Sequence, residues 1–179
     1  MKKLMLLLGV AILSATVACT KSKSEPDILN GPRTEVPSEL TGNWMYGFFS
    51  MTEYWSQNPG DYLGNGLEFA FAFTFNADGT YTQYFTSSSV TSGIVTYQQS
   101  VSEGTVEVDP VSKTINTHPF KAHYKRTSNG QTAEERDLDK DELSPASYTY
   151  TTGVEESGTE ALYLHLDDTD EPLTFLRKP

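Results

Sequence analysis

Acidic residues outnumber basic residues in the chain, 24 to 13, and one group of them has the spacing of a metal-binding loop. Acids occupy alternate positions at Asp137, Asp139 and Asp141, as at the start of a calcium loop of the EF-hand type. That loop needs Gly at its sixth position and Glu at its twelfth, where this chain has Glu142 and Tyr148. A solvated acidic loop is therefore the favoured interpretation, and the acidic stretch 167–171 is interpreted in the same way.

The three histidines form a poor chelating set. His118 and His123 are five residues apart, and such positions on a strand face opposite sides. His165 lies far along the chain. Serine-hydrolase, zinc-protease, phosphate-loop and dinucleotide-binding motifs are all absent from the sequence, and no spacing marks a pair of carboxylates as acid and base. We therefore expect a protein that is not an enzyme and that uses no metal and no cofactor.

Aromatic residues offer a different chemistry, which is contact with a ligand. Tyr54, Trp55 and Tyr62 lie in one glycine-containing stretch, residues 54–66. Aromatic side chains bring contact area at low entropy cost, so they suit stacking on a sugar or closure over an apolar ligand. The same side chains are also suited to fixing a long connection to the wall of a β-sheet. The sequence leaves both interpretations open.

The elements that would position these residues are strands. Large apolar side chains recur at every second residue from Leu67 to Phe75, and the turn 76–79 leads into a second alternating run, Thr80–Phe85. This pattern predicts a hairpin. Further strands are expected at Asn43–Met51, Gly93–Val101, Thr105–Asp109, Lys113–Thr117, Phe120–Thr127, Ser147–Thr152, Ala161–Leu166 and Leu173–Lys178. Short antiparallel strands of this kind predict an all-β fold, a single up-and-down β-barrel of about 8–10 strands.

The N-terminus carries the features of an export signal. Two lysines precede an apolar run, Leu4–Val17, which is too short for a membrane-spanning helix. Residues Thr16-Val17-Ala18-Cys19 resemble the lipobox of bacterial lipoproteins. That resemblance implies cleavage after residue 18 and lipid on Cys19, the only cysteine in the chain. We expect residues 1–18 to be a signal peptide, 19–37 a lipidated cysteine with a flexible tether, and 38–179 one barrel domain.

The lipid anchor would place the domain in the cell envelope without a disulfide, since Cys19 would be consumed by lipidation. In some bacteria an Asp after the cysteine retains such proteins in the inner membrane, so Thr20 favours the outer membrane. Whether the domain would face the periplasm or the outside stays open. The formal net charge of −11 makes nucleic acid a poor partner.

Residues in the first and last strands of the expected barrel, and in one turn, carry a second resemblance. Gly42-Asn43-Trp44, the Asn-x-Asp-Gly-Thr turn at Asn76–Thr80 and Arg177 in the last strand resemble bacterial lipocalin-like lipoproteins. The resemblance implies that Trp44 packs across the closed end of the barrel with Arg177 over its face, as a cation–π pair. It also implies that the connection holding Tyr54, Trp55 and Tyr62 hangs over the open mouth.

Two functions stay open. The first is binding of a small apolar or glycan ligand. The second is a non-enzymatic interaction protein, an accessory subunit or inhibitor in an envelope complex, whose barrel is filled by its own side chains. An eight-stranded barrel is wide enough only to be filled or to hold one small ligand. Whether the interior is filled or hollow therefore distinguishes the two functions. The bulky side chains expected in the interior are Phe69, Phe71, Phe73, Phe75, Tyr81 and Phe85.

Overall fold

The computed structural model describes residues 31–56, 68–166 and 171–179. The expected signal peptide, the lipidation site Cys19, the aromatic Tyr62 and the acidic residues 167–170 lie outside the described residues. In the described part the chain forms nine strands and one short 3-10 helix. They are β1 (Gly42–Tyr46), β2 (Glu68–Phe75), β3 (Thr80–Thr91), β4 (Ile94–Asp109), β5 (Thr114–Ser128), β6 (Gln131–Asp137), η1 (Lys140–Glu142), β7 (Ala146–Val154), β8 (Glu160–His165) and β9 (Leu173–Lys178).

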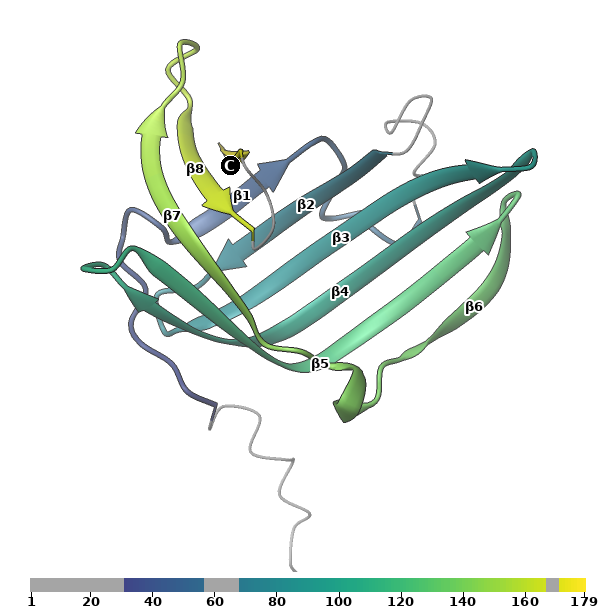
Figure 1. The fold of residues 1–179 in the computed structure, drawn as a ribbon, viewed down its shortest axis with the longest axis horizontal. Coiled ribbons are helices and arrows are strands. Elements are labelled where there is room, and N and C mark those ends of the chain that lie inside the picture. Colours follow the sequence, from purple (N-terminus) through teal and green to yellow (C-terminus); the bar gives the residue numbers. More distant parts are fainter. Residues whose placement is uncertain (1–30, 57–67, 167–170) are drawn as a thin grey trace, which may run out of the picture.

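The strands form one antiparallel sheet that closes into a ring, which confirms the predicted all-β, up-and-down barrel (Figure 1). The ring runs from β1 through β2, β3, β4, β5, β7, β8 and β9 and returns to β1. The predicted hairpin is present as β2 and β3, with Phe75 opposite Tyr81. Two pairs of predicted short strands are instead the single long strands β4 and β5, because a bulge at Glu103/Gly104 lets the pairing continue past the expected break.

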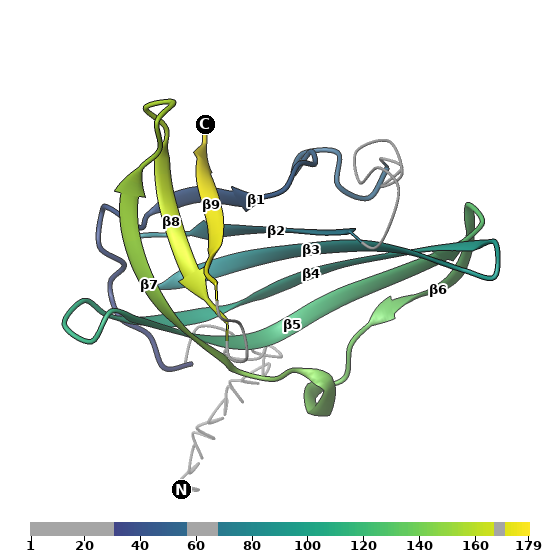
Figure 2. The same ribbon diagram turned by 45° about the horizontal axis from the view of Figure 1, so that its top comes forward.

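Strand β5 pairs with β4 along one edge and is shared between two partners along the other. This division gives the barrel one closed end and one open end. The first part of β5, Thr114–Thr117, pairs with β7 and closes the ring. Its second part, His123–Ser128, pairs with β6, which the sequence analysis did not predict. Figure 2 shows β3, β4 and β5 continuing past the ring as a wide sheet with β6 beside them.

The inner face of the closed half is filled with apolar side chains. Alternation along each strand points these residues inward, and they pack as one buried cluster that includes Trp44, Phe73, Phe75, Tyr81, Val106, Ile115, Tyr150, Leu162, Leu164 and Phe175. Phe73 and Phe75 stack with ring centroids 5.2 Å apart. The fold therefore rests on aromatic packing across the barrel interior, near the start of β1.

The segment before β1 covers this closed end. The Thr34 N–H donates to the Val106 carbonyl at 3.1 Å, and the Val36 N–H donates to the Ala77 carbonyl at 3.2 Å. Val36 and Leu40 are buried within the same cluster. The folded part thus begins before residue 38, the boundary expected from composition. The reason is that β4 extends past the start of β3, and its backbone groups at Val106 and Val108 bond Thr34.

Candidate ligand-binding surfaces

The closed end has the predicted plug of Gly42, Trp44 and Arg177. The Arg177 guanidinium carbon lies 4.2 Å from the centroid of the Trp44 ring. The same guanidinium donates to the carbonyls of Thr41 and Glu39, at 2.6 and 2.8 Å, and its Nε is ion-paired with Glu160. The Trp44 indole N–H donates to the Leu40 carbonyl at 2.6 Å. These contacts hold the guanidinium across the Trp44 ring, and Trp44 is 1 % exposed, so the plug covers this end of the barrel core.

Gly42 permits this arrangement for two reasons. Its φ is +119°, a conformation that residues with a side chain rarely adopt. A Cβ at this position would also lie 2.8 Å from the Arg177 Nη1 atom. The small residue of the Gly-x-Trp pattern therefore makes room for the arginine that covers the tryptophan.

The expectation that the aromatic connection 54–66 hangs over the barrel mouth is wrong for its described residues, 54–56, because the loop 48–56 packs on the outer face of the sheet. The chain crosses close to Ala70 at Gly47, whose φ is +80°. Phe49 and Tyr54 are then buried against Ala70 and Ala72. The two alanines alternate with the inward-facing phenylalanines of β2, and their small size leaves space for the loop.

Tyr54 anchors this loop. Its side chain is 3 % exposed, and its hydroxyl accepts the Ser100 N–H at 3.1 Å and contacts the Phe85 carbonyl. The Gln99 side-chain amide donates to the Tyr54 carbonyl at 2.7 Å. Tyr54 thus fixes the loop to β3 and β4, one of the two roles that the sequence left open. A role in ligand contact remains a prediction for Trp55, and Tyr62 lies outside the described residues.

Trp55 lies at the edge of a groove on this outer face. Its ring meets the Tyr54 and His123 rings edge to face, each at 4.9 Å between centroids, and 36 % of the residue is exposed. The groove has a volume of about 290 Å³ and is lined by Met51, Thr52, Glu53, Tyr54, Trp55, Ser56, Tyr84 and Val101. The structure therefore joins Tyr54 and Trp55 in one concavity, outside the barrel.

A second concavity lies inside the barrel, where β5 parts from β7. It has a volume of about 240 Å³, and the connection from Leu138 to Ala146 covers it. Its polar lining consists of Tyr81, Gln83, Ser102, Thr117, Glu142, Ser144 and Tyr148. Burial raises the pKa of the Tyr81 phenol, so this hydroxyl stays neutral. The sequence indicated only Tyr81 of these residues as part of the barrel interior. The others come together through the pairing of β3, β4, β5 and β7 and through the connection between β6 and β7.

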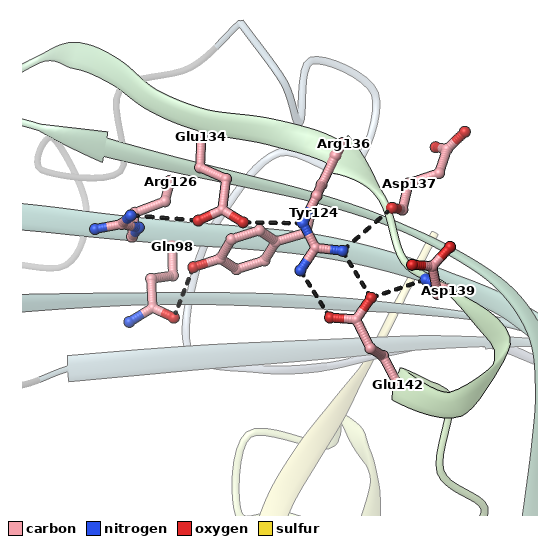
Figure 3. A network of polar contacts seen from close by, with 8 residues as sticks. All are labelled: Gln98, Tyr124, Arg126, Glu134, Arg136, Asp137, Asp139 and Glu142. Atoms are coloured by element: carbon pink, nitrogen blue, oxygen red, sulfur yellow. Dashed lines mark hydrogen bonds and ion pairs between the residues drawn. The ribbon is translucent and has the colours of Figure 1, made fainter.

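A polar network continues from this cavity along the inner face of the open half (Figure 3). Arg136 of β6 holds both Glu142 carboxylate oxygens, at 2.6 and 2.7 Å, and also binds Glu134 at 2.9 Å. Arg126 reaches the second Glu134 oxygen at 3.2 Å. The bonds from Arg136 hold the pKa of Glu142 at about 2 and lower that of Glu134. All four groups are therefore charged and paired at neutral pH.

An aromatic wall faces the same space from β1, β2 and β3. Tyr46 stacks on Phe69 with centroids 5.4 Å apart, and Phe71 lies 5.6 Å from Phe69 and 4.8 Å from Phe85. Phe69 is 38 % exposed. These rings lie at the barrel end opposite the Trp44 plug, as the register places Tyr46 and Phe71 together at the end of β1. The open half thus has one aromatic side and one polar side.

Comparisons with known proteins leave the family open. No family model matches the chain, and no curated protein matches it. The assignment of ligand chemistry therefore rests on the two concavities themselves.

The remaining sequence candidates for chemistry lie on the surface. The expectation that His118 and His123 face opposite sides of the strand is wrong, because the register shift at Glu103/Gly104 lies between their positions and turns both to the outer face. There they pair with Glu107 at 2.9 Å and with Asp137 at 2.8 Å. Within the ranges that the structure covers, no group of three or more potential metal ligands comes together.

The acidic run at 137–141 leads into η1, where the Asp139 N–H donates to Glu142 at 2.8 Å. The described residues also contain no helix that is long and apolar enough to cross a bilayer.

Proposed function

We propose that this chain is a lipid-anchored, lipocalin-like protein of the bacterial envelope whose barrel binds one small amphipathic ligand and performs no catalysis. The observation that carries the proposal is the inner cavity of about 240 Å³, with its polar lining. It opens between a filled core and an aromatic wall, an arrangement suited to a ligand with one polar and one apolar end.

The cavity lining selects an uncharged polar group. Gln83, Ser102 and Thr117 offer an amide and hydroxyls, which donate and accept hydrogen bonds. Glu142 adds a negative charge at the rim, and its partner Arg136 is already held by two carboxylates. A carboxylate head would therefore lose its water without gaining a free cation. A hydroxyl or amide head loses less and finds partners in the lining.

The aromatic wall provides a place for the apolar part of the ligand. Phe85 follows Gln83 by two residues on β3, so both side chains point to the inner face. Phe73 and Phe175 connect the two regions. The Phe73 ring lies 5.9 Å from that of the cavity residue Tyr148 and 5.7 Å from Phe175, and the Phe175 ring lies 5.9 Å from that of the wall residue Tyr46. A head group bound beside Gln83 would direct its chain along Phe85 and Phe71. Long-chain alcohols and monoacylglycerols have this form.

A titration of the full-length protein in detergent tests the proposal. A fatty alcohol and the fatty acid of equal length would be compared by calorimetry, with the alcohol expected to bind more tightly. Ser102→Leu fills the cavity and is expected to weaken alcohol binding about tenfold or more. Ser147→Leu makes the same change on the exposed outer side of β7 and is expected to leave binding unchanged. Equal binding by both variants would contradict the cavity as the site.

A second function is favoured by the filled closed half. Trp44, Phe73, Phe75 and Phe175 occupy the interior near the plug and are all almost fully buried. Such a filled barrel is sufficient for an interaction protein, which would be an accessory subunit or inhibitor of an envelope complex and would need no internal cavity. Failure of every amphipathic compound to bind, with specific cross-links to an envelope protein, would favour this alternative.

A further inference from the structure

The groove on the outer face lies on the opposite side of the barrel wall from the proposed ligand cavity. Tyr84 and Val101 form its floor, whereas their neighbours Gln83 and Ser102 line the inner cavity. Adjacent residues on a strand point to opposite faces. A molecule in the outer groove would therefore meet a different set of side chains from one inside the barrel.

The loop that forms the groove is fixed before any ligand arrives. The Tyr54 side chain and carbonyl are both bonded to β3 and β4, as described above. The Glu53 N–H also donates to the Ser50 hydroxyl at 3.3 Å, and the Ser56 N–H donates to the Glu53 carbonyl at 3.1 Å. Trp55 therefore needs little ordering when it binds a ligand, which reduces the entropic cost of binding.

The groove lining combines aromatic faces with acceptors of hydrogen bonds. Trp55 and Tyr84 offer ring surface, and Thr52, Glu53 and Ser56 offer hydroxyls and a carboxylate at the rim. A sugar ring matches both, because its C–H faces pack on an aromatic ring while its hydroxyls bond the polar rim. A purely apolar chain would leave the rim groups without partners as it displaced their water.

The charge around the groove selects a neutral sugar. Glu53 lies in the lining, and His123 beside Trp55 is itself flanked by Asp137 at 2.8 Å and Glu135 at 3.6 Å. Carboxylates on both sides would repel an anionic ligand. We propose that this groove is a second binding site, for one or two units of a neutral saccharide, with Trp55 as its stacking platform.

Fluorine NMR of the full-length protein in detergent, labelled with 5-fluorotryptophan, tests this site. The chain has two tryptophans, and Trp55→Phe assigns their two resonances. The probes are β-1,4-linked oligomers of N-acetylglucosamine and of glucose. We expect at least one of them to shift the Trp55 resonance in a saturable way, while the Trp44 resonance stays in place because Trp44 is sealed under Arg177.

Variants then separate stacking from structure. Trp55→Ala is expected to weaken saccharide binding about tenfold or more, and Trp55→Phe to retain part of it. Glu53→Gln keeps the shape of the rim and is expected to weaken binding several-fold. Phe48→Ala is the matched control, an exposed aromatic of the same loop that does not line the groove, and should bind as the wild type does. Cavity variant Ser102→Leu should also retain saccharide binding.

Two results would overturn the inference. One is the absence of any Trp55 shift up to about 10 mM probe, a concentration that saturates even a millimolar Kd. The other is undiminished saccharide binding by Trp55→Ala. Both results leave the proposal for the inner cavity intact, since that cavity shares no lining residue with the groove.

Discussion

The two tryptophans differ sharply in their surroundings, and their replacement should differ in cost. Trp44 is 1 % exposed and lies under Arg177, whereas Trp55 is 36 % exposed at the edge of the outer groove. Trp44→Ala is expected to lower the free energy of unfolding by about 3–5 kcal/mol, as for a large buried aromatic. Trp55→Ala should cost under about 1 kcal/mol. Chemical denaturation measures both, and equal losses would contradict the assignment of Trp44 to the plug.

Gly42 should be hard to replace by any residue that has a side chain. In Gly42→Ala the new methyl group would press on Arg177 and the backbone would keep a φ of +119°. We expect a loss of about 1–3 kcal/mol in stability from the backbone conformation. Gly158→Ala is the comparison, since its φ is also positive but nothing lies within 4 Å of the added carbon. If both variants lose the same amount, contact with Arg177 adds nothing.

At the scale of elements, the loop 48–56 depends on the Tyr54 hydroxyl. Tyr54→Phe keeps the ring in its pocket but removes the partner of the Ser100 N–H. A donor that is buried and left without a partner costs about 1–3 kcal/mol, and the Ser100 N–H is partly buried, so denaturant unfolding should show a loss toward the lower end of that range. Hydrogen exchange should also quicken at Ser100. An unchanged exchange rate there would mean that the hydroxyl does not bind β4.

The connection between β6 and β7 is held by an ion pair with a defined pH range. The pKa of Glu142 falls from 4.5 to about 2 because Arg136 and the Asp139 N–H bind its ionised form. The pair therefore stabilises the folded connection fully above pH 4.5, and this contribution is lost as the pH falls toward 2. A carbon NMR titration of the Glu142 carboxyl should show a midpoint near 2. A midpoint near 4.5 would contradict the bidentate pairing.

Local pattern was enough to predict much of the fold, and the missing parts depend on long-range pairing. Alternation along 67–75 predicted the β2–β3 hairpin, and the resemblance carried by Gly42-x-Trp44 and Arg177 implied the plug. The position of the loop 48–56 on the outer face was not predicted, although Ala70 and Ala72 indicate that this face is covered. An outward face with apolar rather than polar residues indicates that something covers it. Nothing in the local sequence could place Gln83, Ser102 and Thr117 in one cavity, because three strands contribute them.

At the scale of the whole molecule, the proposed anchor can be tested without reference to the barrel. Cys19→Ser removes the thiol that the lipobox-like sequence presents for acylation. We expect the variant to carry no radiolabelled acyl group and to leave the membrane fraction, since Cys19 is the residue that would carry the lipid of the anchor. A variant that still carries label and still sediments with membranes would contradict the lipid anchor. Protease treatment of intact cells then shows which side of the membrane the domain faces.

The central claim is that the barrel interior, between the plug and the aromatic wall, receives an amphipathic ligand. Photo-crosslinking with a fatty alcohol that carries a diazirine near its hydroxyl tests it most directly, with labelled residues located by mass spectrometry. We expect labels on Tyr81, Gln83, Ser102 or Thr117, and we expect unlabelled alcohol to compete. Labels confined to the outer face, or labelling that unlabelled alcohol does not reduce, would contradict it.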